Sequence, residues 1–311
     1  MTIVGETGVT GILSGRHMAA TRLGERFRLE ERISATGGLS VWKATDEVLC
    51  RPVTVHLLPR GQEVPRSVVA AVQAAARVND SRLAMVYDTD YASECPYIVS
   101  EWTRGTHLED LVLSGLPSPA LAAAMIADAA DALAVAHEAG RPHLCLSPRG
   151  LRWHNSSGLK ITGLGIDAAL SGVTSDDPAA ADTRALAQLL YALLTGCWPG
   201  EEATALPPAP RHRGGVYTPR QVRAAVPGVL DAITCHALQL TPPGVSRSVL
   251  TPAGLAAALN SVQRPSYQPF DPAEAADCAP ALAQDGMSRR ARHARTRSGV
   301  RHRTTLLRPA A

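Results

Sequence analysis

Hydrophobic and polar residues alternate along three short stretches near the beginning of the chain. RFRLEERIS and GGLSVWKATDEVL predict two strands joined by a glycine turn, and RPVTVHLLP alternates as a third strand. The pattern then becomes helical in SVVAAVQAAARVND, an alanine-rich stretch of good helix propensity. The first part of the chain is therefore predicted to be three strands followed by a helix.

Helical patterns dominate the later part of the chain. PALAAAMIADAADALAVAHEAG predicts a long amphipathic helix that ends at Gly140, and ADTRALAQLLYALLTGCWP predicts a second. Between them, the stretch from His143 to Gly165 reads as a short segment, a connector and a hairpin-like pair ending in a glycine-rich turn. RQVRAAVPGVLDAITCHALQL and TPAGLAAALNSV predict the last helices, after a proline-rich connection over residues 200–219.

The two ends of the chain differ in composition from its middle. Residues 1–24 are interpreted as a flexible leader, residues 264–286 as a proline-rich linker and residues 287–311 as a basic disordered tail. The tail holds eight Arg and no acid, which leaves 23 basic against 28 acidic residues elsewhere, a net charge of −5. Only the tail is thus a candidate for contact with an anionic membrane or nucleic acid. The alternative is that the tail is a frame-shifted end.

Composition excludes several classes of protein. The hydrophobic content of 45% supports a sizeable core, and aromatic residues at 4% mean that Leu, Val, Ile and Ala must build it. The six cysteines include no C-x-x-C pair, which argues against a zinc site and favours reduced thiols in a cytoplasmic protein. No signal segment and no run of about 18 apolar residues is found, so no transmembrane segment is expected.

The stretch HLCLSPRGLRWHNSSGLKITGLG resembles the catalytic and metal-binding loops of a Ser/Thr protein kinase. That family has H-R-D-L-K-P-x-N, then a strand, then D-F-G. The resemblance places Cys145 at the catalytic Asp, Gly150 at the metal-binding Asn and Gly163 at the metal-binding Asp, while His143 is kept in a structural role. Family positions that carry chemistry are thus replaced, so no catalytic residue and no metal site is expected.

The opening strands resemble the small lobe of the same family, where a loop of the form G-x-G-x-x-G-x-V cradles the phosphates of ATP. With Val41 as the anchor, the three glycine positions fall on Ser34, Thr36 and Leu39. Glycine is needed there because backbone N–H groups must approach the phosphates without interference from a Cβ. Leu39 is therefore expected to crowd that approach.

The lysine–glutamate pair that holds the phosphates in the family is also missing. V-T-V-H puts His56 at the lysine, and Ala71 stands at the glutamate of the following helix. A satisfied or half-exposed histidine is the main interpretation of His56, and substitution for the lysine is the alternative. Glu101 and Trp102 match the hinge, where backbone groups hold adenine in the family; Val41, His56, Glu101 and Trp102 are thus the residues of a degenerate nucleotide cleft.

Three further features bear on activity. A Cys145–His143 nucleophile pair is conceivable, but the family pattern points the histidine into the lobe. Asp167 is the only acid near Gly163, and it is interpreted as a solvated loop charge. The activation segment, Leu170 to Ala181, is short and lacks A-P-E, whereas Asp182 matches a family Asp that braces the catalytic loop from beneath.

The resemblance covers residues 25–263 and implies an α+β, two-lobed protein kinase-like fold. A small β-rich lobe spans about residues 25–101 and a larger helical lobe about 104–263. The chain resembles in particular actinobacterial Ser/Thr kinase-like proteins, of the pseudokinase type associated with the MviN-type lipid II flippase.

That resemblance implies a catalytically inactive module that acts as a regulatory protein-binding scaffold in cell-envelope and peptidoglycan regulation. The implied partners are an upstream Ser/Thr kinase and a phosphothreonine-reading domain. No cofactor is expected beyond weak, metal-independent ATP binding, and the location is cytoplasmic, with membrane association through partners. The alternative is a divergent ATP-binding Ser/Thr protein kinase or nucleotidyl transferase with relocated catalytic residues.

Overall fold

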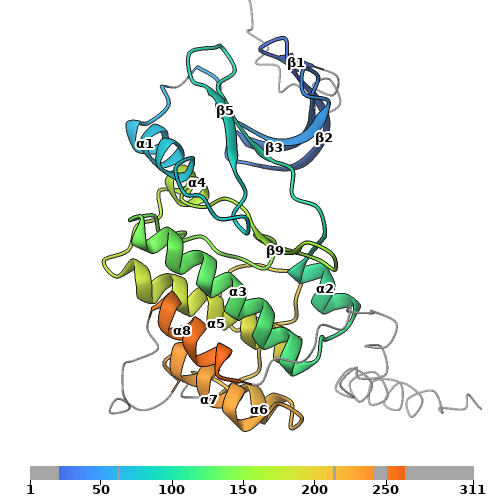
Figure 1. The fold of residues 1–311 in the computed structure, drawn as a ribbon, viewed down its shortest axis with the longest axis vertical. Coiled ribbons are helices and arrows are strands. Elements are labelled where there is room, and N and C mark those ends of the chain that lie inside the picture. The colour runs from blue at the N-terminus through green and yellow to red at the C-terminus, as the bar shows by residue number, and fades with distance from the viewer. Residues whose placement is uncertain (1–20, 62, 213–214, 241–250, 263–311) are drawn as a thin grey trace, which may run out of the picture.

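The computed structural model describes residues 21–61, 63–212, 215–240 and 251–262. These residues form a β-rich lobe, blue in Figure 1, followed by a helical lobe that runs from green to orange. The predicted α+β, two-lobed architecture is confirmed. The predicted linker and tail, residues 264–286 and 287–311, lie outside the described residues and stay predictions.

One antiparallel sheet makes up most of the small lobe, with the strand order β1-β2-β3-β4-β6-β5. Alternate residues point to opposite faces of a strand, so Phe27 and Leu29 of β2 share a buried face with Val53 and Val55 of β4. The strands are β1 (Arg22–Leu23), β2 (Phe27–Thr36), β3 (Leu39–Asp46), β4 (Arg51–Leu57), β5 (Val86–Asp90) and β6 (Tyr97–Glu101).

Strand β1 lies inside the stretch that the sequence analysis interpreted as a leader. Arg22 pairs with Arg28, and Leu23 pairs with Phe27. The Leu23 side chain is buried in the same apolar cluster as Phe27. The sheet therefore begins before the predicted boundary at residue 24. The two residues of β1 contain one apolar side chain and show no periodicity in the sequence.

The other face of the sheet is covered by two short helices. Helix α1 (Arg66–Ala75) packs there through Val68 and Val72, and helix α4 (Ile166–Ser171) packs against α1. Figure 1 shows α4 beside α1, between the sheet and the long helices below. Because α4 comes from the far side of the hinge, it connects the two lobes.

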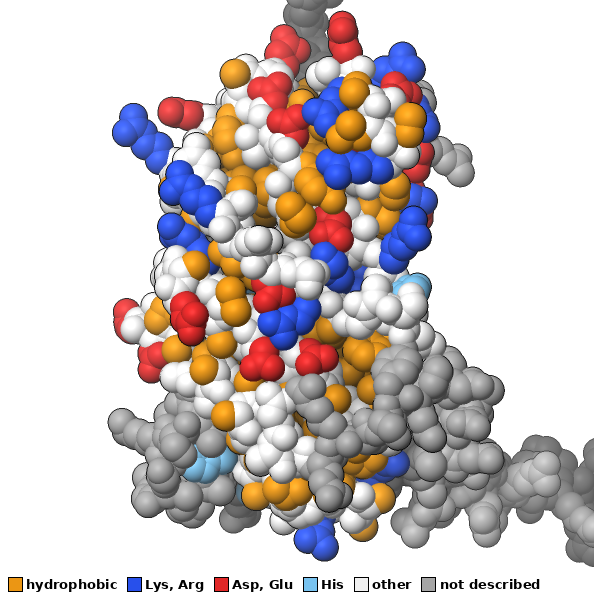
Figure 2. Space-filling model, viewed as in Figure 1, with side chains coloured by type: hydrophobic (Ala, Val, Ile, Leu, Met, Phe, Trp, Pro, Cys, Tyr) orange, Lys and Arg blue, Asp and Glu red, His pale blue; other side chains and the backbone are white. Residues whose placement is uncertain are grey.

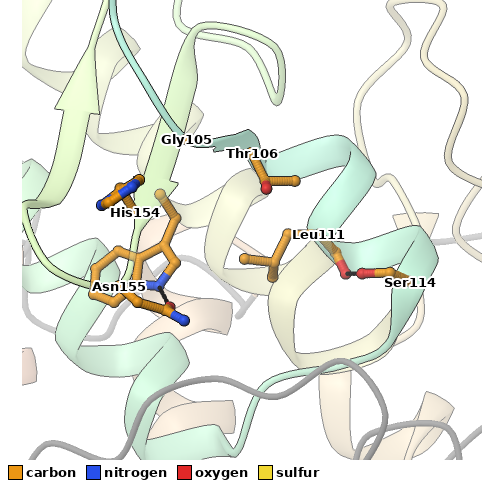
Figure 3. Close-up of a pocket in the computed structure, with 7 residues that line it drawn as sticks. Gly105, Thr106, Leu111, Ser114, His154 and Asn155 are labelled. Carbon is orange, nitrogen blue, oxygen red and sulfur yellow. Dashed lines mark hydrogen bonds between the residues drawn. The ribbon is translucent and has the colours of Figure 1, made fainter.

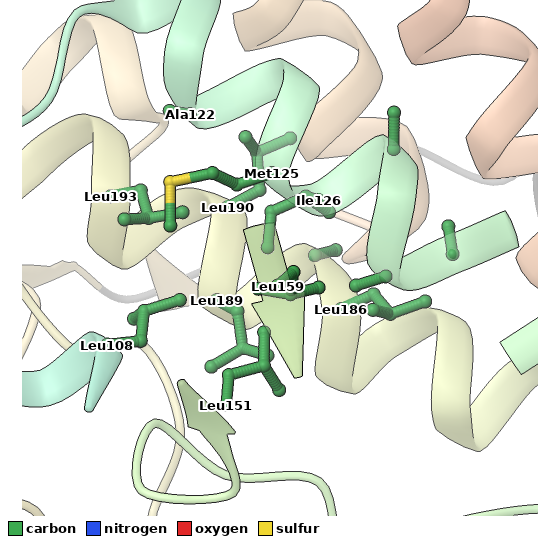
Figure 4. Close-up of a cluster of buried hydrophobic side chains, with 14 of the residues drawn as sticks. Leu108, Ala122, Met125, Ile126, Leu151, Leu159, Leu186, Leu189, Leu190 and Leu193 are labelled. Atoms are coloured by element: carbon green, nitrogen blue, oxygen red, sulfur yellow. The ribbon is translucent and has the colours of Figure 1, made fainter. Parts of the chain in front are cut away.

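The helical lobe is built around α3 (Pro119–Glu138) and α5 (Pro178–Thr195), which pack against each other. In Figure 4, Met125 and Ile126 of α3 lie close to Leu190 and Leu193 of α5. The other elements are β7 (Thr106–His107), α2 (Leu108–Ser114), β8 (Leu151–His154), β9 (Gly158–Ile161), β10 (Arg211–His212), β11 (Gly215–Val216), α6 (Pro219–Val222), α7 (Gly228–Ala237) and α8 (Pro252–Asn260).

Helix α3 has clear local signals at both ends. The Ser118 hydroxyl accepts a hydrogen bond from Leu121 N, Pro119 opens the first turn, and Gly140 follows the helix at a φ of +69°. Among the described residues, α3 alone is long and apolar enough to cross a membrane. Its alanine-rich surface is packed in the core between α5 and α8.

Charged side chains of both signs are interspersed over the face of the small lobe that Figure 2 shows. Several form ion pairs, such as Arg26 with the fully buried Asp46. The pKa of Asp46 is lowered chiefly by its hydrogen bond with Arg26. This face therefore presents mixed charge and no large field of one sign.

Candidate functional site

The loop that begins at His143 is held by a buried carboxylate from α5. Asp182 Oδ2 accepts a hydrogen bond from His143 N, and Oδ1 accepts one from Leu144 N, both at 2.7 Å. His137 Nε2, at the end of α3, lies 2.7 Å from Oδ2. The carboxylate thus joins two helices to the loop backbone, where Leu144 adopts a φ of +63°.

His143 and Cys145 point to different surroundings. The His143 ring is fully buried, and its Nε2 lies 2.8 Å from Thr162 O, just before Gly163. Burial raises the pKa of the Cys145 thiol, and the charges of Asp167 and Asp182 raise it further. A nucleophilic cysteine needs a lowered pKa, so this environment opposes Cys145–His143 chemistry.

The turn between β2 and β3 is a tight two-residue hairpin. Thr36 pairs with Leu39, and Gly37 and Gly38 fill the turn at φ values of +57° and +86°. Leu39, at the third glycine position of the predicted loop, packs against an apolar cluster below the sheet. An apolar side chain therefore occupies the place where phosphates would need bare backbone.

That cluster, called the α4 cluster here, joins the small lobe to the segment after Gly165. Its buried members are Leu58 just after β4, Ile98 on β6, Val68 and Val72 on α1, and Ile166 on α4. Leu39 and Leu170 are among the partly buried side chains that pack against it. The sheet face that carries His56 is therefore closed by hydrocarbon from α1 and α4.

The positions of the missing lysine–glutamate pair hold uncharged groups. His56 is 8% exposed, and its Nδ1 is buried without a hydrogen-bond partner. Burial lowers the pKa of His56, and the charge of Asp167 opposes this shift. Ala71 lines a shallow cavity of about 190 Å³ together with Ala75, Leu164 and Ala168. A buried neutral imidazole cannot replace the permanent charge of a lysine.

Asp167 is placed differently from the sequence interpretation. It lies in the first turn of α4, where it is partly buried, and its carboxylate fills the space in front of Gly163: a Cβ added at Gly163 would collide with it. Gly163 has a φ of +79°. Asp167 thus occupies the region that an Asp side chain at Gly163 would enter. In the sequence, only the spacing of four residues between Gly163 and Asp167 indicates this proximity.

The hinge residues Glu101 and Trp102 face different partners. Glu101 Oε2 pairs with Lys160 Nζ of β9 at 2.7 Å. Two cations lie over the Trp102 ring: Lys43 Nζ at 5.6 Å and Arg152 Cζ at 5.4 Å from the centroid. These two cations could not be paired from the sequence, because they come from β3 and β8, which are far apart along the chain.

A cavity of about 230 Å³ lies beyond the hinge, between α2 and the β8–β9 hairpin. Figure 3 shows Thr106, Leu111 and Ser114 on one side of it and His154 and Asn155 on the other. Its polar groups interact locally: Trp153 Nε1 donates to Asn155 Oδ1, and Ser114 Oγ donates to Leu111 O.

Comparison with known proteins shows which proteins the chain is similar to. No protein-family model matches the chain. The chain is 30% identical over 257 residues to the serine/threonine-protein kinase PknB of Mycolicibacterium smegmatis, covering 71% of this chain and 40% of that protein. A probable PknB of Corynebacterium glutamicum is 29% identical over 165 residues, covering 49% and 25%. The chain is homologous to actinobacterial Ser/Thr protein kinases.

Solved structures show the same fold. A kinase-domain structure of Mycobacterium tuberculosis PknI matches with a TM-score of 0.59 at 16% identity, covering 78% of this chain and 97% of that one. A structure of Rad53 with AMP-PNP matches at 0.60 and 18% identity, covering 74% and 64%. The chain spans about a quarter to two fifths of the length of the curated relatives named above.

The protein kinase fold implies bound Mg²⁺, and the residues present do not fit that ion. Mg²⁺ prefers several oxygen ligands in octahedral geometry. Gly150 and Gly163 offer no side-chain oxygen, and Asp167 is one carboxylate beside His56 and Cys145. Among the described residues, no group of three His, Cys, Asp or Glu side chains could hold a metal ion.

The buried, neutral His56 predicts a loss of stability in acid. Its folded pKa lies below the unfolded value of about 6.5, so the unfolded chain binds the proton first. The stabilising contribution is fully present above pH 6.5 and is lost as the pH falls toward the folded pKa. Urea unfolding at several pH values between 7.5 and 5 gives the free energy of unfolding as a function of pH. This free energy should fall less steeply with falling pH in His56→Leu than in the wild type, by up to about 1.4 kcal/mol per pH unit. An identical pH dependence in both proteins would show that His56 has the same pKa in the folded and unfolded states, which contradicts the prediction.

Proposed function

We propose that the chain is a catalytically inactive, kinase-like module that acts as a regulatory protein-binding scaffold. The α4 cluster carries this proposal, because it fills the sheet face beside His56 with Leu39, Ile166 and Leu170. Phosphoryl transfer depends on positioned cations and charge stabilisation. A surface of hydrocarbon and neutral imidazole supplies neither.

The conformation of the loop that begins at His143 also supports this proposal. Asp182 and His143 keep the loop backbone in a fixed conformation, although Cys145, Gly150 and Gly163 carry no catalytic acid or metal ligand. A loop that keeps its hydrogen-bonded conformation without the catalytic groups supports a role in binding rather than in catalysis. His143 and Asp182 are therefore proposed as structural residues, and the family catalytic positions as inactive.

The context that we propose is regulation of the cell envelope and peptidoglycan synthesis in the cytoplasm, with membrane association through partners. An upstream Ser/Thr kinase would phosphorylate the chain, and a phosphothreonine-reading domain would then bind it. The homology to PknB-type kinases supports a regulatory role in general. The pseudokinase type associated with the MviN-type flippase is the specific match that we propose.

A transfer assay tests the proposal. The full chain, incubated with labelled ATP and either Mg²⁺ or Mn²⁺, should label neither itself nor a basic protein substrate above the level of a no-enzyme control. An active actinobacterial kinase domain serves as the positive control and as the upstream enzyme in a second reaction. That reaction should phosphorylate the chain and create binding to a phosphothreonine-reading domain. Transfer of label by the chain alone would refute the proposal that the chain is catalytically inactive.

A second function, a divergent ATP-dependent kinase or nucleotidyl transferase, is favoured by one observation. The Asp167 carboxylate occupies the space in front of Gly163, as a relocated acid would. If the chain transfers either a phosphoryl or a nucleotidyl group, Asp167→Asn should abolish the activity. Asp176→Asn, an exposed acid nine residues later, is the matched control and should leave it unchanged.

A further inference from the structure

Three side chains at the hinge form a cationic group, called the hinge constellation here: Lys43, Trp102 and Arg152. Lys43 lies on β3 on the same face as Val41, since Trp42 and Ala44 point into the buried cluster on the other face. Arg152 comes from β8 in the helical lobe. Both cations reach the same indole ring, at 5.6 and 5.4 Å from its centroid.

Arg152 is held in place by uncharged groups. Its guanidinium donates one hydrogen bond to Gly105 O at 3.0 Å and one to His107 Nε2 at 2.8 Å. The tautomer of His107 follows from its partners: Nδ1 lies 2.7 Å from Arg149 O, which only accepts, so Nδ1 donates and Nε2 accepts. A braced guanidinium of this kind is preorganised for an incoming acceptor.

No direct ion pair neutralises that guanidinium in the part of the chain that the structure describes. Among the ion pairs of the described residues, none includes Arg152, and it is only partly exposed. Burial lowers the pKa of Arg152, Asp110 opposes the shift, and Arg149 adds to it. Among the described residues, the one ion pair of Lys43 is long, with 3.9 Å between its Nζ and Glu30 Oε2. Both cations would gain from an anion between the lobes, near the ring that they share.

We propose that the hinge constellation binds an anionic group, the phosphate or carboxylate of a small molecule, held by Lys43 and Arg152 beside Trp102. This polarity is the reverse of nucleotide binding by kinases, where adenine faces the hinge and phosphates face the lysine. Here the charges lie at the hinge, and the opposite end is the neutral His56 with the α4 cluster. The inference does not depend on whether the chain is catalytically inactive.

Isothermal titration of the full chain at low salt in EDTA tests the site. Tripolyphosphate tests binding of phosphate groups, and citrate tests binding of carboxylates. Comparing ATP with adenosine shows whether the phosphates or the adenine ring are bound. At least one of the two anions should bind. If the site takes phosphates, ATP should match tripolyphosphate within a few-fold and adenosine should not bind. Raising the salt concentration should weaken binding, because the side chains are partly exposed.

Variants connect binding to the residues. Lys43→Gln and Arg152→Gln should each weaken binding of the preferred anion about tenfold, because each removes a charge-assisted contact. Lys43 lies on the surface of a strand, so Lys43→Gln should fold. It therefore tests the site even if Arg152→Gln fails to fold. Arg77→Gln, an exposed cation after α1, is the matched control and should bind as wild type does. Binding of adenosine as tight as that of ATP, unchanged affinity in Lys43→Gln, or no binding of either anion at millimolar concentration overturns the proposal.

Discussion

Replacing Asp182 by alanine should lower the free energy of unfolding by about 3–5 kcal/mol. The carboxylate is fully buried and accepts hydrogen bonds from His143 N and Leu144 N. Without it, two backbone N–H groups lose their partners at about 1–3 kcal/mol each, and the contact with His137 is lost as well. Urea unfolding at pH 7, followed by circular dichroism, measures the loss.

Two variants make the Asp182 result interpretable. Asp182→Asn keeps the shape and one acceptor oxygen but turns an amide N–H₂ toward a backbone N–H. It should therefore lose about 1–3 kcal/mol. Asp176→Ala removes an exposed acid before α5 and should change stability by less than about 0.5 kcal/mol. An Asp182→Ala loss below about 1 kcal/mol would mean that the loop holds its conformation without this acid.

The fold could be predicted from the sequence because its local signals agree with its long-range contacts. The alternation at Val53 and Val55 marks the buried face of β4, and the Gly37–Gly38 pair sits in the tight turn after β2. Ser118 and Gly140 delimit α3 at both ends. The short strand β1 was not predicted, because two residues with one apolar side chain, Leu23, show no periodicity in the sequence.

Only the positions of the candidate site that match family motifs could be predicted from the sequence. Spacing identified His56 and Gly163 as replaced positions, since a replacement is visible in a sequence. Spacing could not place Asp167, because a carboxylate covers Gly163 only after the six residues Ile166–Ser171 form a helix. The two cations over Trp102 were equally hidden, because strand pairing and lobe packing, rather than local sequence, bring them together.

The α4 cluster leads to the second large prediction: Ile166→Ala should lower the free energy of unfolding by about 2–5 kcal/mol. Ile166 is 4% exposed and packs with Leu58, Ile98 and Val72 of the small lobe. Removing three carbons leaves a cavity between α4 and the sheet, and the packed surroundings can close it only in part. Chemical unfolding of the full chain, compared with wild type at the same pH, gives the difference.

Val173→Ala is the matched control for this contact. Val173 lies just after α4 but is 41% exposed, so its truncation should change stability by no more than about 0.5 kcal/mol. Equal small losses in both variants would show that α4 does not hold the lobes together. The Ile166→Ala variant also separates the two structural causes that we propose for inactivity. Loosening α4 exposes the sheet face beside His56 but adds no cation, so the variant should still transfer no phosphoryl group. If it did, the α4 cluster alone would have been the barrier to catalysis.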